Sequence, residues 1–316
     1  MAWRQAYALT VSMAFTASMG VGVTKATTVA YWRFEEGVAG QLLPHTFAKT
    51  DWSTYAVTDV SGNGNHLFGY DANEGGAAHA WMNDVPATTI PATGATNNLA
   101  VRNTGSVPGL FTGTHQMSPK GINLQAWTPS TWTIEVSFYA TDVGYRTIVG
   151  RDGRFVADHN PDLAPLYFQT VGSGDGEFNG HLAIKFVDTA GILHTAYSLA
   201  PIELGRWYHA AAVSDGTTLS LYLDSLDGNG YVLQQATLLV TSDPRLASAG
   251  NDKSWSVGRG YYGPSEDTDR WYGYIDEVRI SDVALTPDQF LFAVPEPASV
   301  VLLAGGTLLM LRRRRM

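Results

Sequence analysis

The most chemically informative side chain of the sequence is a carboxylate that falls among apolar residues. If the stretch 271–280 forms a strand, Asp276 shares one face with four large apolar residues, Tyr272, Tyr274, Val278 and Ile280. A buried, ionised carboxylate needs backbone N–H donors, a cation or a metal as its partner. The loop 59–65 (DVSGNGN) offers Asp59 and Asn65 as further oxygen donors in a tight turn, and such ligands suit Ca²⁺. The alternative is that Asp276 caps turn N–H groups and Asp59 starts an ordinary Asx-turn.

A second group of residues has the chemistry of sugar binding. The stretch 258–271 (GRGYYGPSEDTDRW) combines a Gly- and Pro-containing acidic loop with Tyr261, Tyr262 and Trp271. Aromatic rings stack on the apolar faces of sugars, while carboxylates bind their hydroxyl groups. We therefore predict these three aromatic residues as ligand-binding residues. The alternative is that they close the end of a hydrophobic core.

The sequence contains no recognisable catalytic constellation. Glycoside hydrolases need a pair of carboxylates on either side of the scissile bond, and no Glu-x-Asp-x-x-Glu spacing occurs. Glu135 is the only carboxylate on its face of the predicted strand, where its neighbours are Thr133 and Ser137. We therefore expect it to be solvated on the outer face of that strand. The His-Glu-x-x-His and Gly-x-Ser-x-Gly motifs are also missing. His209 is expected to be a hydrogen-bonded structural residue, and the protein is not expected to be an enzyme.

The elements that position these residues are predicted to be strands. In the stretch 131–138 every second residue is large and apolar, which predicts an inward face made by Trp132, Ile134, Val136 and Phe138. The same alternation occurs in 218–223, and a further strand is expected over 207–213. Many short strands with Gly-rich turns predict an all-β fold, a two-sheet antiparallel jelly-roll sandwich.

The turns between these strands also have readable sequences. Ser214-Asp215-Gly216-Thr217 and Asp227-Gly228-Asn229-Gly230 are typical of hairpin turns, and 172–176 is expected to be a turn as well. The only clear helical signal is Thr286-Pro287-Asp288-Gln289, with a capping Thr, a Pro at the first helical position and a Gln that completes a capping box. It predicts one or two helical turns.

Composition excludes some classes of partner and of stabilisation. The 316 residues carry a formal net charge of −9, and Lys and Arg cluster only at the C-terminus, which disfavours nucleic acid as a partner. The chain has no cysteine, so it has no disulfide framework and no thiolate chemistry. Stability must therefore come from a hydrophobic core, a metal or both.

Both ends of the chain have the composition of targeting segments. Arg4 followed by an uncharged, largely apolar stretch predicts a signal peptide over residues 1–26, removed by signal peptidase. At the other end, residues 294–316 contain Pro295, Glu296 and Pro297, an apolar run over 298–311, and Arg312, Arg313, Arg314 and Arg315. The apolar run is shorter than the roughly 20 residues that span a bilayer, so we expect a short membrane-embedded helix. Residues 27–293 remain as one sandwich domain.

Four blocks of this domain resemble the landmarks of the concanavalin A-like LamG domain. They are YWRFEEG at 31–37, DVSGNGNH at 59–66, WYHAAAV at 207–213 and YIDEVRI at 274–280. The resemblance implies that the first and last strands are neighbours and that a structural calcium ion bridges them. Our hypothesis is one Ca²⁺ held by Asp276, Asp59 and Asn65 with carbonyl groups from 34–37. The segment 69–116 departs from the pattern, and we expect it to be an enlarged loop at one edge.

The C-terminal segment resembles the PEP-CTERM sorting signal of Gram-negative bacteria. The resemblance rests on the order of its three parts, a Pro-Glu-Pro motif, a short apolar run and an Arg-rich end. It implies processing by an exosortase, transient anchoring in the inner membrane, and a final location at the cell surface or outside the cell. An ordinary C-terminal tail anchor is the alternative.

Three classes of function follow from these observations. The first is an exported surface or matrix protein whose sandwich binds polysaccharide or a surface protein without catalysis. The association of PEP-CTERM proteins with exopolysaccharide and biofilm favours this class. The second is a carbohydrate-active enzyme with an atypical site, and the third is a structural envelope protein without a ligand.

Overall fold

The computed structural model describes residues 28–46, 55–70, 79–104, 109–112, 124, 126–151, 164–248, 255–262 and 265–294. The predicted signal peptide, the Pro-Glu-Pro motif, the apolar run and the four terminal arginines lie outside these residues. Within the described residues, no helix combines the length and the hydropathy that crossing a bilayer requires.

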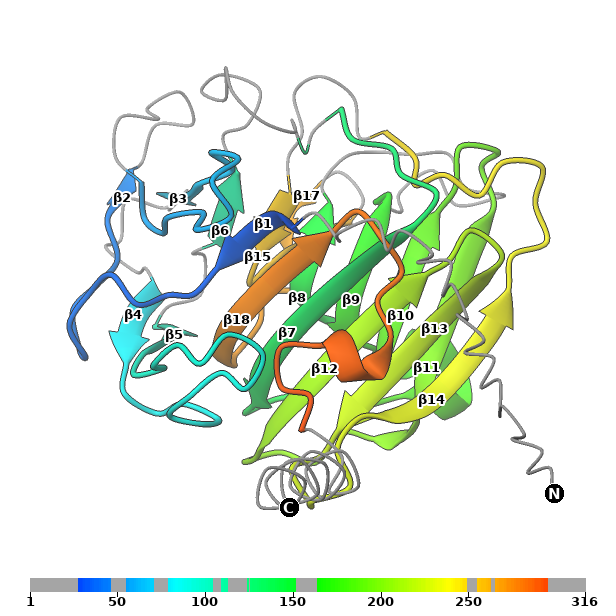
Figure 1. The fold of residues 1–316 in the computed structure, drawn as a ribbon. Helices are drawn as coiled ribbons and strands as arrows, with labels where there is room; N and C mark the ends of the chain where they lie inside the picture. The colour runs from blue at the N-terminus through cyan, green and yellow to red at the C-terminus, as the bar shows by residue number, and fades with distance from the viewer. Residues whose placement is uncertain are drawn as a thin grey trace, which may run out of the picture.

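The first sheet is built around the long central strands that carry the predicted alternation. It has eight strands, in the order β14 (Val232–Leu238), β13 (Thr218–Asp224), β12 (Trp207–Ser214), β7 (Trp132–Ala140), β18 (Gly273–Ser281), β5 (Ala100–Asn103) and β4 (His79–Met82), with β1 (Thr28–Trp32) also paired to β18. All of these pairs are antiparallel. The first and last strands of the chain are thus neighbours, as the sequence resemblance implies (Figure 1).

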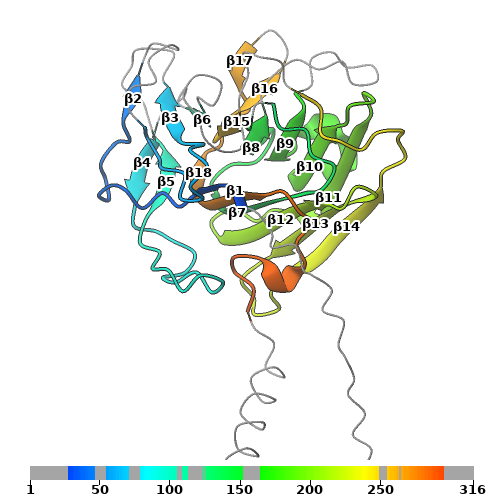
Figure 2. The same ribbon diagram turned by 45° about the horizontal axis from the view of Figure 1, so that its top comes forward.

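The second sheet packs on the first and is also eight-stranded. Its order is β11 (Leu193–Pro201), β10 (His181–Val187), β9 (Leu166–Thr170), β8 (Arg146–Arg151), β15 (Trp255–Val257), β6 (Gly109–Thr112), β3 (Leu67–Tyr70) and β2 (His45–Thr46). Only the short β2–β3 pair in it is parallel. A two-stranded ribbon, β16 (Gly260–Tyr262) and β17 (Ser265–Thr268), follows β15. Figure 2 shows the two layers, and the predicted all-β sandwich is confirmed.

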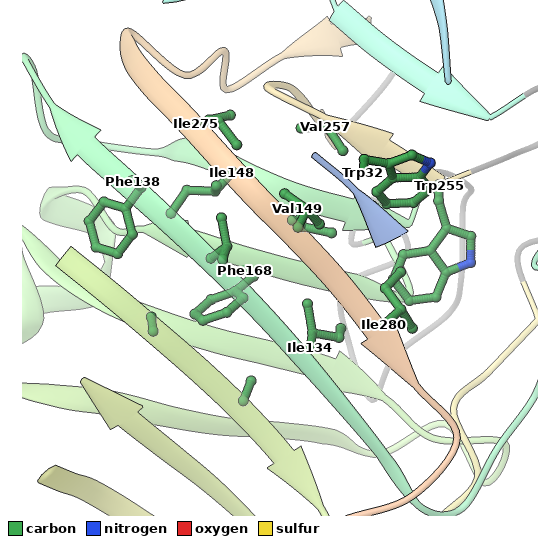
Figure 3. Packing of buried hydrophobic residues seen from close by; sticks show 14 of the residues in the cluster. Trp32, Ile134, Phe138, Ile148, Val149, Phe168, Trp255, Val257, Ile275 and Ile280 are labelled. Atoms are coloured by element: carbon green, nitrogen blue, oxygen red, sulfur yellow. The ribbon is translucent and has the colours of Figure 1, made fainter. Parts of the chain in front are cut away.

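The hydrophobic core lies between the two sheets. The four residues predicted to face inward from 131–138 are all buried there. They meet residues of the second sheet such as Ile148, Val149 and Phe168 (Figure 3). Trp132 meets Phe186 edge to face, with 5.5 Å between ring centroids, which is a preferred aromatic geometry. Because every second residue of a strand points to one face, the alternation alone was enough to predict this packing.

Two of the three predicted turns form as expected, whereas 172–176, in the connection between β9 and β10, lies mostly in the 3₁₀ helix η1 (Ser173–Phe178). The stretch 214–217 joins β12 to β13 as a hairpin, in which the Asp215 carboxylate accepts the N–H groups of Thr217 and Thr218 at 2.7 Å each. Gly216 has φ +86, a conformation that favours glycine. The stretch 227–230 likewise joins β13 to β14. The helical signal at 286–289 forms the 3₁₀ helix η2 (Pro287–Gln289), whose Gln289 Oε1 accepts the Thr286 N–H at 2.9 Å.

The outer face of the first sheet is covered over β7 and β12, and this overturns the expectation that Glu135 is solvated. The chain after β18 folds back over β7 and β12, placing Leu285 and Phe290 against Ala211 and Val213 of β12. Beneath this C-terminal segment, which we define as residues 283–293, Glu135 is only 1% exposed. Strand alternation distinguishes two faces, but it does not show which other part of the chain covers the polar one.

The segment 69–116 is not simply an enlarged loop. It contains β4 and β5, which extend the first sheet beyond β18, and β6, which lies between β15 and β3 in the second sheet. These strands are only four residues each, so their alternation is too short to be recognised among Ala, Thr, Gly and Asn.

Candidate functional site

The carboxylate of Asp276 is buried, but not on the predicted face. The register between β18 and β7 shifts between Asp276 and Arg279, and Glu277 adopts the left-handed conformation with φ +48. This bulge breaks the period of two, so Ile275, Val278 and Ile280 enter the core. Asp276 is the register partner of Ser137, and both residues lie on the face of the first sheet that points away from the core. The prediction that Asp276 shares a face with Val278 and Ile280 is therefore wrong.

Asp276 lies instead beneath the loop that precedes β5. Its Oδ2 accepts a hydrogen bond from Asn97 Nδ2 at 2.8 Å, and the same Nδ2 donates to the Ala87 carbonyl at 3.0 Å. The remaining oxygens of both side chains, Asp276 Oδ1 and Asn97 Oδ1, are buried without a hydrogen-bond partner. Burial raises the pKa of Asp276 well above its usual range, and the neighbouring Glu277 carboxylate adds to this effect. Each of the two side chains therefore keeps one buried oxygen that is available to a donor or a cation.

Glu277 belongs to a second buried network beside it. Its carboxylate accepts hydrogen bonds from Arg33 Nε and Nη2 at 3.0 Å each, and from the Tyr31 hydroxyl. Burial raises the pKa of Glu277, while the bonds from Arg33 and Tyr31 act in the opposite direction. Since Arg33 and Tyr31 already satisfy this carboxylate, Glu277 is a structural link between β1 and β18.

Asp59 and Asn65 are brought together in the loop that precedes β3. Asp59 Oδ1 accepts the N–H groups of Tyr31 and Ser61 at 2.9 Å each, and Oδ2 accepts that of Asn65 at 3.0 Å. The Asn65 carbonyl accepts Trp32 Nε1 at 2.7 Å, and Asn65 Nδ2 donates to the Val29 carbonyl at 2.9 Å. Asp59 thus forms the Asx-turn that was the alternative to a metal ligand, and it ties the loop to β1.

The three predicted metal ligands lie in two separate hydrogen-bond networks. Asp59 and Asn65 bond to each other and to β1, whereas the side-chain bond of Asp276 is to Asn97. No three His, Cys, Asp or Glu side chains of the described residues gather closely enough to hold a metal. The unsatisfied oxygens of Asp276 and Asn97 nevertheless fit a hard cation. Asn97 was missed because nothing in the sequence links its loop to β18.

The structure tests the predicted sugar-stacking role for Trp271 and leaves it untested for Tyr261 and Tyr262. Trp271 is 1% exposed, packs edge to face on Phe138 with 5.5 Å between centroids, and donates Nε1 to the Tyr274 carbonyl at 3.2 Å. A buried ring cannot stack on a ligand, so the prediction for Trp271 is wrong and the alternative of a core-closing aromatic holds for it. Tyr261 and Tyr262 lie in β16. Their role stays a prediction.

A cluster of polar and aromatic side chains lies on the outer face of the second sheet. Asp175, in the 3₁₀ helix η1 (Ser173–Phe178), accepts three hydrogen bonds. They come from Lys185 Nζ at 2.5 Å, the Tyr197 hydroxyl at 3.0 Å and the Tyr145 hydroxyl at 3.1 Å. Burial raises the pKa of Tyr197, and the Asp175 charge adds to it. We refer to Tyr145, Asp175, Phe178, Lys185 and Tyr197 as the Asp175 cluster.

Aromatic stacking and glycines shape this cluster. The rings of Phe178 and Tyr197 are parallel within 7°, with centroids 4.0 Å apart, and both rings are partly exposed. A Cβ atom at Gly174 would lie 2.4 Å from the Tyr145 hydroxyl, so only glycine lets η1 approach this ring. The sequence marked 172–176 as a turn, but it did not indicate that Tyr145, which directly precedes β8, and Tyr197 of β11 lie beside it.

The cluster offers binding chemistry rather than bond-breaking chemistry. A partly exposed aromatic pair provides an apolar surface, and the charged Lys185 and Asp175 beside it are hydrogen-bonding partners. His209, the histidine predicted from the sequence to be structural, lies elsewhere, on the covered face of the first sheet. Its Nδ1 is 2.6 Å from Ser137 Oγ, its ring stacks on Phe292, and burial lowers its pKa to about 3. It is the hydrogen-bonded structural residue that was predicted.

Comparison with known proteins gives one family and several solved structures. Residues 112–290 match the family described as the concanavalin A-like lectin/glucanases superfamily. A search of curated proteins finds no match. Domain 4 of AbnA, a GH43 extracellular arabinanase from Geobacillus stearothermophilus in complex with arabinotriose, is 18% identical; the match covers 84% of this chain and 96% of that one, with a TM-score of 0.49. The CBM40 of the Ruminococcus gnavus IT-sialidase is 14% identical, over 52% of this chain and 81% of that one, with a TM-score of 0.35.

Proposed function

The chain belongs to the concanavalin A-like lectin/glucanase superfamily, and on that premise we propose that it is a non-catalytic binding protein whose sandwich takes polysaccharide. The observation that carries this proposal is the Asp175 cluster. Its aromatic pair suits the apolar face of a sugar ring, and its charged groups suit the hydroxyl groups. A protein ligand at the same surface is the alternative that the test must separate.

A hydrolytic function has less support from the arrangement of carboxylates. Glu135 is paired with Arg279 beneath the C-terminal segment, and Asp276 and Glu277 are fully buried. A polysaccharide does not reach these groups, and a glycosidase needs its carboxylates on either side of the bond to be cleaved. We therefore propose binding and not glucanase activity.

The first prediction concerns the aromatic pair. Replacing Phe178 or Tyr197 by Ala should weaken retention on the polysaccharide by about tenfold, because a stacked ring contributes on the order of 1.5 kcal/mol. Affinity electrophoresis over a panel of polysaccharides measures this. Tyr55→Ala is the matched control, since Tyr55 is 41% exposed and stacks on His66 in another part of the fold. Equal retention of all three variants, or no retention of the parent protein on any polysaccharide, contradicts the proposal.

We also propose that the sandwich carries a structural Ca²⁺ held by oxygens of Asp276 and Asn97. The support is that both side chains keep a buried oxygen without a hydrogen-bond partner. Bound calcium would neutralise the buried carboxylate and so fasten β18 to the loop before β5. Asp59, whose two carboxylate oxygens both accept backbone N–H groups, is assigned to the turn instead, whereas Asn65 keeps its Oδ1 buried without a hydrogen-bond partner and stays a predicted ligand.

Export and sorting complete the proposal and rest on the sequence of the two ends. We propose removal of residues 1–26 by signal peptidase, then exosortase-dependent sorting to the surface through the Pro-Glu-Pro motif and the terminal arginines. Fractionation of a Gram-negative host that encodes an exosortase tests this. Substitution of Pro295, Glu296 and Pro297 by Ala should hold the protein in the inner membrane, whereas unchanged surface delivery would support an ordinary tail anchor or another route.

A further inference from the structure

A cavity of about 620 Å³ lies between the β13–β14 turn and the C-terminal segment. It is lined by residues of two stretches, 224–231 and 287–294. Its volume is within the range of about 300–1,000 Å³ typical of small-molecule sites. It is also far larger than a bare ion needs, since a single water takes up only about 30 Å³. The space therefore suits an organic ligand.

The charged groups that line this cavity are all acidic. Asp224 is 5% exposed, and a hydrogen bond of its side chain within the described residues uses Oδ1, which accepts the Leu226 N–H at 2.7 Å. Burial raises the pKa of this carboxyl, and the charge of Asp227 adds to the shift. Asp288, across the cavity, is exposed and accepts the Thr286 hydroxyl at 2.5 Å. Both carboxylates therefore have oxygen lone pairs to spare for a cationic ligand.

Arg206, a cation whose charge acts on Asp227 of the β13–β14 turn, is engaged elsewhere. Arg206 donates Nη1 to Glu203 at 3.0 Å and Nη2 to the Ser225 carbonyl, and it does not line the cavity. No lysine or arginine is among the lining residues. An anionic ligand would thus meet repulsion, while a positively charged one would meet two carboxylates.

The remaining walls suit a sugar ring. Tyr231 packs edge to face on Phe290, with 4.8 Å between centroids, and Leu226 and Pro287 add apolar surface. On the other side, Gly228 and Gly230 have φ +91 and +67, and a Cβ atom at either would meet nothing within 4 Å. The turn therefore lines the cavity at these two positions without side chains, which leaves room there for the hydroxyl groups of a ligand.

We propose that this cavity binds an amino sugar residue that carries a free, protonated amine. Asp224 and Asp288 receive the ammonium group, the Tyr231 side receives the apolar sugar face, and the glycine turn receives the hydroxyl groups. The inference rests on the proposed polysaccharide-binding function for its ligand class. It adds a second contact, separate from the Asp175 cluster, that selects for positive charge.

Calorimetric titration of the full chain with a short glucosamine oligomer tests the proposal. Binding is expected, and the N-acetylated oligomer of the same length should bind at least tenfold more weakly, because acetylation removes the charge. Asp288→Asn should weaken binding of the glucosamine oligomer by about tenfold, since charge-assisted hydrogen bonds are stronger than neutral ones. Asp243→Asn is the matched control, because it removes one negative charge at an exposed pair with Arg245, away from the cavity.

Three outcomes would overturn the inference. Equal binding of the acetylated oligomer would remove the role of charge, and equal binding of a lysine oligomer would remove the role of the sugar. An unchanged affinity of Asp288→Asn would place the site elsewhere; this residue is exposed, so its variant should fold. Failure of the proposed function looks different: Phe178→Ala and Tyr197→Ala would then have no effect on any polysaccharide, while Asp288 still governed the amino sugar.

Discussion

Replacement of Arg279 by Met should lower the free energy of unfolding by about 3–5 kcal/mol, because it leaves a buried carboxylate without its cation. Arg279 Nε and Nη2 lie 2.6 Å and 2.5 Å from Glu135 Oε2, and Glu135 is 1% exposed. Burial raises the pKa of Glu135, and the arginine opposes this rise. Arg279 also donates Nη2 to the Gln289 carbonyl at 2.9 Å, so the substitution loosens the C-terminal segment as well.

Urea unfolding of the purified protein at neutral pH measures the loss. The double variant Glu135→Gln with Arg279→Met should regain much of it, because Gln removes the buried charge and can still accept the Leu291 N–H, which Glu135 Oε1 accepts at 2.7 Å. A loss below about 1 kcal/mol for the single variant would mean that solvent screens the pair as it does a surface ion pair, contrary to the burial described.

Calcium should raise the stability of the protein by about 2.7 kcal/mol when it is present at one hundred times its dissociation constant. The parent protein should thus melt at a higher temperature in calcium than in a chelator. Asp276→Asn should abolish this difference. In the chelator the same variant should be at least as stable as the parent, because it removes a buried carboxylate that lacks a counter-charge.

Asp59→Asn separates the revised ligand set from the one expected on sequence grounds. An amide has one acceptor oxygen in place of the two that receive the Tyr31, Ser61 and Asn65 N–H groups. The variant should therefore lose stability equally with calcium and with chelator. If Asp59→Asn instead removes the calcium response and Asp276→Asn leaves it intact, the assignment to Asp276 and Asn97 is wrong. A parent protein with no calcium response excludes the ion altogether.

Local sequence patterns predicted the strands and turns well. The alternation over 131–138 placed four core residues correctly, and the Asp-Gly turns and the Thr286 capping box formed as expected. These features depend on contacts between residues close in the chain, whose geometry follows from strand period and turn chemistry. The short strands β4, β5 and β6 escaped because four residues give too little alternation to recognise.

The candidate sites were predicted less well, because they depend on which distant segments meet. Asp276 was correctly expected to be buried, yet a bulge at Glu277 turned it to the other face and beside Asn97. Trp271 is a residue type that suits sugar binding, and it follows an acidic loop, but its side chain is buried in the core. No local signal indicated that Tyr145 and Tyr197 would flank Asp175, since the three residues come from segments far apart in the sequence.

The sequence by itself therefore determined the all-β class, the inward face of the central strands, the turns between them and the chemistry available at each position. The tertiary structure alone decided which polar groups are buried and with what partners. Glu135 illustrates the difference: its strand and its face follow from alternation, but its burial follows from Arg279 and a segment about 150 residues later. Period and propensity act over a few residues, whereas burial and pairing of charge are set by the packing of segments that the chain brings together only on folding.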